Sequence, residues 1–126
     1  MESSKRSKSV ETGRLGEVLA EQALQAKGYE VIERNWRGPE GEIDLVARDS
    51  DYLVFVEVKA RKSAKFGSPE ESVVPQKQRR IANTALAYLQ QTVQQDKPWR
   101  IDIVAIELSA SNRVIRLAHY VGVEIN

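Results

Sequence analysis

The stretch that decides the fold is GEIDLVARDSDYLVFVEVKAR, which runs from Gly41 to Arg61. Two runs rich in Val, Ile, Leu, Phe and Tyr, residues 43–48 and 53–60, flank a polar turn at 49–51. This pattern predicts a hairpin of two strands. The second run is apolar on both alternating faces as far as Val56, which is typical of a central strand covered on both sides.

Three charged residues interrupt this apolar pattern, namely Asp44, Glu57 and Lys59. A buried charge without a partner is costly, so these positions call for a function. Side chains two residues apart share a face of a strand, so Glu57 and Lys59 should project together, roughly 7 Å apart. If Arg48 pairs with Leu53, Asp44 falls opposite Glu57, with their Cβ atoms about 5 Å apart. A slip of one residue would place the two carboxylates on opposite faces.

Two facing carboxylates repel each other, and a divalent cation between them would remove the repulsion. Hard cations such as Mg²⁺ take oxygen ligands, commonly one or two carboxylates completed by water and phosphate. The chain has no cysteine, and its one histidine, His119, lies far from this stretch, which argues against a zinc-type site. A cation held here would favour phosphodiester hydrolysis, with Lys59 orienting or activating water or neutralising the phosphate. Glu17 is a candidate for a further ligand. A buried ion-pair network is the structural alternative for the same residues.

The rest of the chain predicts a mixed five-stranded sheet flanked by helices. Residues 1–11 are polar and serine-rich, which predicts a disordered tail, and residues 12–126 are expected to form a single domain. The expected order of elements is α-β-β-β-α-β-β. The helices are predicted at 12–27 and 75–95, and the three strands outside the hairpin at 29–36, 100–108 and 113–121.

The first predicted helix has a bare stripe formed by Gly13, Gly16 and Ala20, which would let its backbone approach another element closely. Thr12 is expected to cap its N-terminus, and Gly28 is expected to stop it in a left-handed conformation.

Basic residues gather on both sides of the predicted site. Their number in the first turns of the second helix opposes the helix dipole, which indicates an anionic partner, although solvated charges are the alternative. Contacts to nucleic acid would be phosphate contacts without sequence readout. The candidates are Arg61, Lys62 and Lys65 after the hairpin and Lys77, Arg79 and Arg80 in the second helix.

The composition of the chain is that of a soluble globular protein. The chain has 126 residues, 41% of them hydrophobic and 29% charged, with a net charge of +1, which is ordinary for one soluble domain and gives no general basic character. No apolar run is long enough to span a membrane, and no secretory signal follows the basic N-terminus. We therefore expect a cytoplasmic protein without a membrane partner.

Several sequence motifs follow one another along the chain. They are GRLGE (13–17), the Asn35 region, GEID (41–44), VFVEVKAR (54–61), FGSPEE (66–71), the helix starting near Lys77 and RIDIVAI (100–106). These motifs in this order make the chain similar to the PD-(D/E)xK nuclease superfamily, and it specifically resembles the YraN-type family of small uncharacterised bacterial proteins, predicted to be endonuclease-like. The resemblance implies a restriction-endonuclease-like core and Mg²⁺ or Mn²⁺ bound by Asp44 and Glu57, with Lys59 as the catalytic lysine. Glu17 matches the helix carboxylate of the branch that includes the archaeal Holliday junction resolvases.

Three hypotheses remain open at this point. The first is a metal-dependent nuclease acting on DNA, including branched or structured DNA, for which symmetric cutting of two strands would call for a homodimer. The second is a nucleic-acid-binding or scaffold protein that keeps the metal site without turnover. The third is a structural domain held by a buried ion-pair network.

Overall fold

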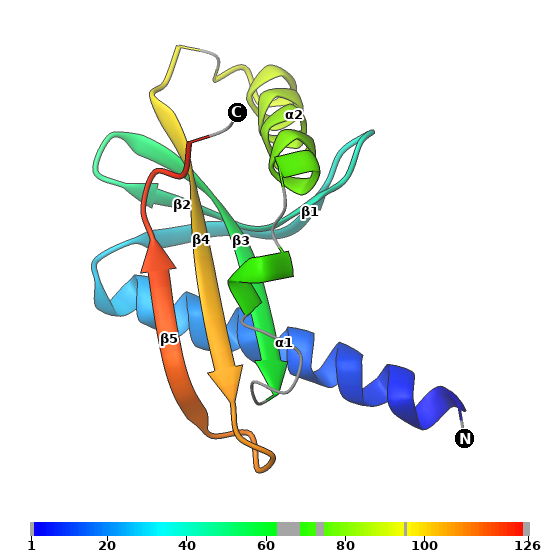
Figure 1. The fold of residues 1–126 in the computed structure, drawn as a ribbon. Coiled ribbons are helices and arrows are strands. Elements are labelled where there is room, and N and C mark those ends of the chain that lie inside the picture. The colour runs from blue at the N-terminus through cyan, green and yellow to red at the C-terminus, as the bar shows by residue number, and fades with distance from the viewer. Residues whose placement is uncertain (1, 63–68, 73–74, 95, 125–126) are drawn as a thin grey trace.

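The computed structural model describes residues 2–62, 69–72, 75–94 and 96–124, which form one five-stranded sheet with helices on both faces (Figure 1). Lys65 and the predicted helix end at residue 95 lie outside the described residues. The elements follow the predicted order, with a short 3-10 turn, η1, added before the second helix. They are α1 (Glu2–Ala26), β1 (Glu30–Arg37), β2 (Glu42–Asp49), β3 (Tyr52–Lys62), η1 (Pro69–Ser72), α2 (Pro75–Gln91), β4 (Trp99–Leu108) and β5 (Val114–Tyr120).

The sheet is mixed, as predicted, and β3 lies at its centre in the order β1-β2-β3-β4-β5. The pair β3–β4 is parallel and the other three pairs are antiparallel. Parallel neighbours need a long crossover connection, and η1 and α2 supply it between β3 and β4.

The hairpin has the register that places the charged residues together. Arg48 pairs with Leu53, as predicted, and the pairing extends to Asp49 and Tyr52 across a two-residue turn. Ser50 takes the left-handed conformation in this turn, with φ of 53°. At the other end, the regular ladder between β2 and β3 stops at the pair of Leu45 and Val56. Asp44 is therefore the first residue of β2 beyond the ladder.

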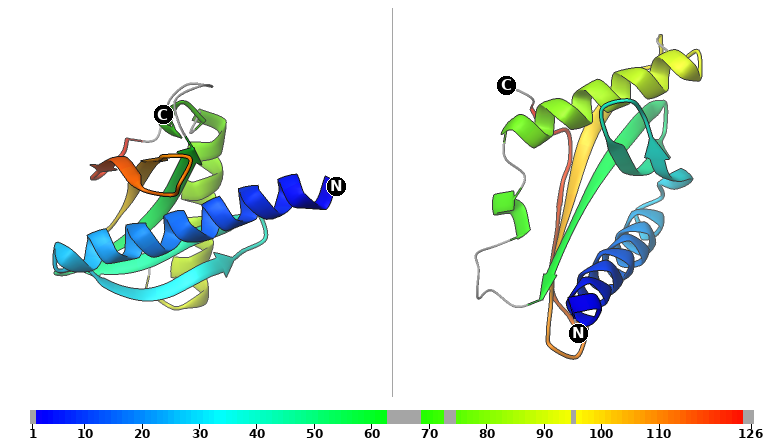
Figure 2. Two further views of the ribbon diagram at one scale, coloured as in Figure 1. Left: turned by 90° about the horizontal axis from the view of Figure 1, so that it is seen from below. Right: turned by 90° about the vertical axis from the view of Figure 1, so that its right-hand side faces the viewer.

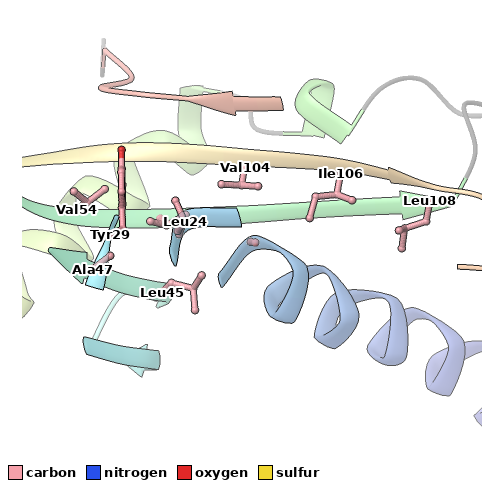
Figure 3. Close-up of a cluster of buried hydrophobic side chains, with 10 residues drawn as sticks. Leu24, Tyr29, Leu45, Ala47, Val54, Val104, Ile106 and Leu108 are labelled. Atoms are coloured by element: carbon pink, nitrogen blue, oxygen red, sulfur yellow. The ribbon is translucent and has the colours of Figure 1, made fainter. Parts of the chain in front are cut away.

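Both faces of the central strand are buried, which confirms the interpretation of its apolar run. Val54 lies in one core with Leu24 of α1 (Figure 3), and Val56 belongs to the same core. Phe55 lies in the other core with Tyr88 of α2. Figure 2 shows the two helices on opposite sides of the sheet. Consecutive residues of β3 therefore pack into alternate cores as far as Val56, and Glu57 is the first charged residue after them.

Helix α1 begins ten residues earlier than predicted. The structure continues it back to Glu2, so the segment expected to be a disordered tail is helical and Thr12 lies inside the helix. The segment 2–11 contains no Gly or Pro, so nothing in it ends a helix that packing has started further along. The C-terminal end is as predicted, because Gly28 is left-handed with φ of 91°. The N–H groups of Gly28 and Tyr29 close the last turn onto Gln25 and Leu24.

A second polar cluster forms around β4, at the level where Asp102 pairs with Val56 of β3. Asp102 of β4 is fully buried, and its carboxylate accepts hydrogen bonds from Tyr29, Arg100, His119 and the backbone N–H of Gly122. These partners come from the residue before β1, from β4, and from β5 and the residues that follow it. The sequence prediction did not single out this cluster. No helix in the described part of the chain is long and apolar enough to cross a membrane.

Candidate functional site

The site begins where β2 leaves β3. The carboxylate of Asp44 accepts a hydrogen bond of 2.8 Å from the backbone N–H of Val58, across the point where regular pairing has stopped. The carboxyl groups of Asp44 and Glu57 also share a hydrogen bond. The hairpin therefore brings these two carboxyls together, as the predicted register requires.

Burial and mutual repulsion set the protonation of the two carboxyls. Burial raises the pKa of Glu57 to about 8, and the neighbouring Asp44 carboxylate adds to the rise. Burial likewise raises the pKa of Asp44 to about 6, with a contribution from Glu17, while the Val58 N–H opposes it. Near neutral pH, Glu57 therefore keeps its proton while Asp44 is mostly ionised. One proton lies where two carboxylates would otherwise repel each other.

Lys59 lies next to this pair on β3, and a second lysine reaches it from α2. Burial lowers the pKa of the Lys59 amine, and a hydrogen bond with Lys77 and the charge of Lys77 lower it further. Glu57 and Asp44 act in the opposite direction, because carboxylates stabilise the ammonium form. An amine in this position is closer to its neutral form than a solvated lysine and could accept a proton from water.

Glu17 approaches the site from α1. The packing that brings it there depends on Gly16, where an added Cβ would lie 2.5 Å from the Cβ of Ala60 on β3. The Glu17 carboxylate accepts a hydrogen bond of 2.6 Å from the side-chain amide of Asn35 on β1. The same amide donates to Glu42 of β2 at 2.9 Å.

Two cavities border these groups. One of about 180 Å³ lies between the start of β2, β3 and α2. Glu57 and the basic residues Lys77 and Arg80 line it, together with Glu40, Gly41, Glu42, Ile81 and Thr84. The other, of about 430 Å³, lies between α1 and the β1–β2 pair and is lined by Arg14, Glu17, Val18, Glu21, Arg34, Asn35 and Leu45.

The predicted basic residues are placed unequally. Lys77 and Arg80 line the smaller cavity, so α2 brings them to the carboxyls. Arg61 follows Lys59 by two positions on β3, and Lys62 is the exposed last residue of that strand. Arg79 is exposed on α2. Lys65 is outside the described residues.

Sequence reasoning placed Lys77 among the phosphate contacts and did not foresee its contact with Lys59. It also gave no role to Glu42, whose carboxylate lies in the same acidic group as Glu17. Within the described residues, no three carboxylate or imidazole groups converge closely enough to hold a metal ion as they stand. The arrangement places two carboxyl groups side by side, those of Asp44 and Glu57, with the Glu17 carboxylate nearby.

The protein-family model described as uncharacterised protein family UPF0102 matches residues 16–106. The chain belongs to this family. The matched segment contains Glu17, the hairpin and α2, so Glu17, Asp44, Glu57, Lys59 and Lys77 all lie within the UPF0102 match.

UPF0102 proteins that are similar to this chain come from diverse bacteria. One from Dehalococcoides mccartyi is 44% identical over 79% of this chain and 82% of that protein. One from Syntrophus aciditrophicus is 44% identical over 86% of each chain. One from Beutenbergia cavernae is 46% identical over 88% of this chain and 93% of that protein. These matches confirm the predicted resemblance to the YraN-type family.

Proposed function

We propose that this UPF0102 protein is a metal-dependent nuclease of the PD-(D/E)xK type that hydrolyses phosphodiester bonds in DNA, including branched or structured DNA. The observation that supports the proposal most is the meeting of Asp44, Glu57 and Lys59 at the point where β2 and β3 separate. The side chains of β3 are buried in the two cores as far as Val56, and the charged residues Glu57 and Lys59 follow directly. A domain with a purely structural role has no need for that concentration of like charge.

The donor set fits Mg²⁺ or Mn²⁺. Both ions accept carboxylate oxygens and keep several waters, so two protein carboxylates are a sufficient anchor. In the protein alone, a proton holds Asp44 and Glu57 together, and a divalent cation would replace it and remove the repulsion in the same way. Glu17 would be a further ligand. When bound, the cation would draw the scissile phosphate to the site and make water near it more acidic.

The chain's own residues would do the remaining work. Lys59, with its lowered pKa, would orient the attacking water and accept its proton, or neutralise charge that develops on the phosphate. Lys77 would keep the pKa of Lys59 low, because the Lys77 ammonium disfavours a second positive charge beside it. Arg80, in the same cavity as Glu57, would bind a phosphate next to the one that is cut.

The experiment that tests the proposal is a cleavage panel on linear, flapped and four-way DNA, each with Mg²⁺, with Mn²⁺ and with EDTA. Metal-dependent cutting of at least one substrate is expected. Asp44→Asn should abolish it, because the neutral amide keeps the shape and removes a charged ligand. Lys97→Ala, which changes an exposed lysine in the turn before β4, should cut as the wild type does. Metal-dependent DNA binding without any cutting would favour the binding-only alternative.

A further inference from the structure

Asn35 interrupts the regularity of β1 next to the site. The β1–β2 ladder pairs Arg34 with Leu45 and Trp36 with Ile43, so Asn35 is the β1 residue that faces Asp44. Its backbone is left-handed, with φ of 52°, inside a strand whose other residues are extended. Asparagine tolerates this conformation better than most residues, but a strand has no general need for it. Residues held in such a strained conformation cluster at active sites and ligand clamps.

The direction of the side chains shows what this departure achieves. Consecutive residues of a regular strand point to opposite faces of the sheet. Here Arg34 and Asn35 both reach helix α1: Arg34 binds Glu21 through two hydrogen bonds, and Asn35 binds Glu17, one helical turn earlier. The left-handed residue therefore redirects the amide to the helix side, where an extended residue would point away.

The amide donates both of its hydrogens to carboxylates. Its Nδ2 atom donates to Glu17 at 2.6 Å and to Glu42 at 2.9 Å. Only the nitrogen end of an asparagine can donate, so two carboxylate partners fix which way the amide faces. The amide thereby bridges two carboxylates from different elements, Glu17 of α1 and Glu42 of β2. The carboxylate of Glu17 is held on the sheet side of its helix.

We propose that Asn35 is a positioning residue that holds Glu17 beside Asp44, so that the two carboxylates serve the same cation. The contact is not needed to dock the helix, because the bond between Arg34 and Glu21 already ties α1 to β1 one turn further along. The part of the inference that concerns the cation rests on the proposed function. The part that concerns Glu17 stands on the hydrogen bonds alone. Partners of this kind, behind the ligands, commonly change metal affinity by about 10- to 100-fold when they are removed.

The first test is calorimetric titration of Mn²⁺ into two variants and the wild type. Asn35→Gly keeps the left-handed backbone accessible and removes the amide, and it should weaken Mn²⁺ binding by about 10- to 100-fold. Asn112→Gly makes the same change at another left-handed asparagine, with φ of 66°, in the turn before β5. It should bind as the wild type does. Wild-type affinity in Asn35→Gly would overturn the proposal.

The second test needs no metal. In EDTA, Asn35→Asp should lower the melting temperature by several degrees, because a carboxylate then faces Glu17 and Glu42. Adding Glu17→Gln should recover part of that loss, since the glutamine amide can donate to the new carboxylate. If Glu17→Gln gives no recovery, Asn35 does not hold Glu17. If the wild type binds no Mn²⁺, the proposed function fails, and this exchange still decides the role of Asn35.

Discussion

Replacing Glu57 with glutamine should stabilise the protein against unfolding in EDTA, and the gain should grow with pH. The pKa of Glu57 is 4.5 in the unfolded chain and rises to about 8 in the fold. A raised carboxyl pKa means that the folded state holds a proton which the unfolded chain releases. The wild type therefore loses stability as pH rises from 4.5 through 8, by at most about 1.4 kcal/mol per pH unit. Glutamine does not titrate and escapes this loss.

The magnitude follows from the same shift. Neutral pH lies about 2.5 pH units above the unfolded-state pKa of 4.5. The stability that the wild type loses to Glu57 at neutral pH is therefore at most about 3 kcal/mol. Glu57 lines a cavity that reaches solvent, so part of the charge is hydrated, and we expect a gain of about 1 to 2 kcal/mol. Below pH 4.5 the gain should fade towards zero, because the wild-type carboxyl then becomes protonated in the unfolded chain as well as in the fold.

The assay is urea unfolding of wild type and Glu57→Gln in EDTA, across that pH range. The free energy of unfolding should diverge steadily towards alkaline pH. Saturating Mn²⁺ should stabilise the wild type and leave the variant nearly unchanged, which reverses the order of the two proteins. A difference between the two proteins that does not depend on pH would refute the reasoning, because it would show that Glu57 titrates normally in the fold.

Three further outcomes concern packing and binding. Gly16→Ala should cost about 1 to 3 kcal/mol in urea unfolding, because its Cβ would lie 2.5 Å from a side chain of β3. Gly13→Ala has nothing within 4 Å and should be neutral or stabilise by up to about 1 kcal/mol; equal losses for the two variants would contradict the close packing of α1. Asp102→Ala should cost about 3 to 5 kcal/mol, since the buried His119 side chain loses its carboxylate partner and Arg100 is left with the carboxylate of Asp49, and a cost below about 1 kcal/mol would mean that the cluster does not form. Arg80→Ala should lower the slope of log DNA affinity against log salt by about 1, and Arg113→Ala, in the turn before β5, should leave it unchanged; identical slopes would remove Arg80 from the interface.

The hairpin and its charged pair could be predicted from sequence because they depend on local rules. The apolar runs fix which residues face the core, and the short polar turn leaves few registers in which both runs stay buried. Once Arg48 pairs with Leu53, the partner of Glu57 is determined. The order of strands follows for a similar reason, since a helix between β3 and β4 favours a parallel pair.

Other features depend on contacts between distant elements, and no local pattern announces them. The left-handed backbone of Asn35 has no sequence signal beyond the residue type. The contact between Lys59 and Lys77 requires knowing where α2 crosses the sheet. Helix α1 starts early because the helix propagates into residues 2–11, which contain no stop signal. The helix propensity of that polar segment did not by itself favour a helix.

Single-turnover cleavage of a four-way DNA junction by wild type and Lys59→Ala in Mn²⁺ tests the central claim most directly. DNA and Mn²⁺ binding should be measured in parallel, because Lys59 is proposed to act on the chemical step. The account predicts that the variant still binds both and cuts at least 100-fold more slowly, as expected when a proton-transfer or charge-stabilising group is lost. Cutting at the wild-type rate by the variant, or no metal-dependent cutting by the wild type, would contradict it.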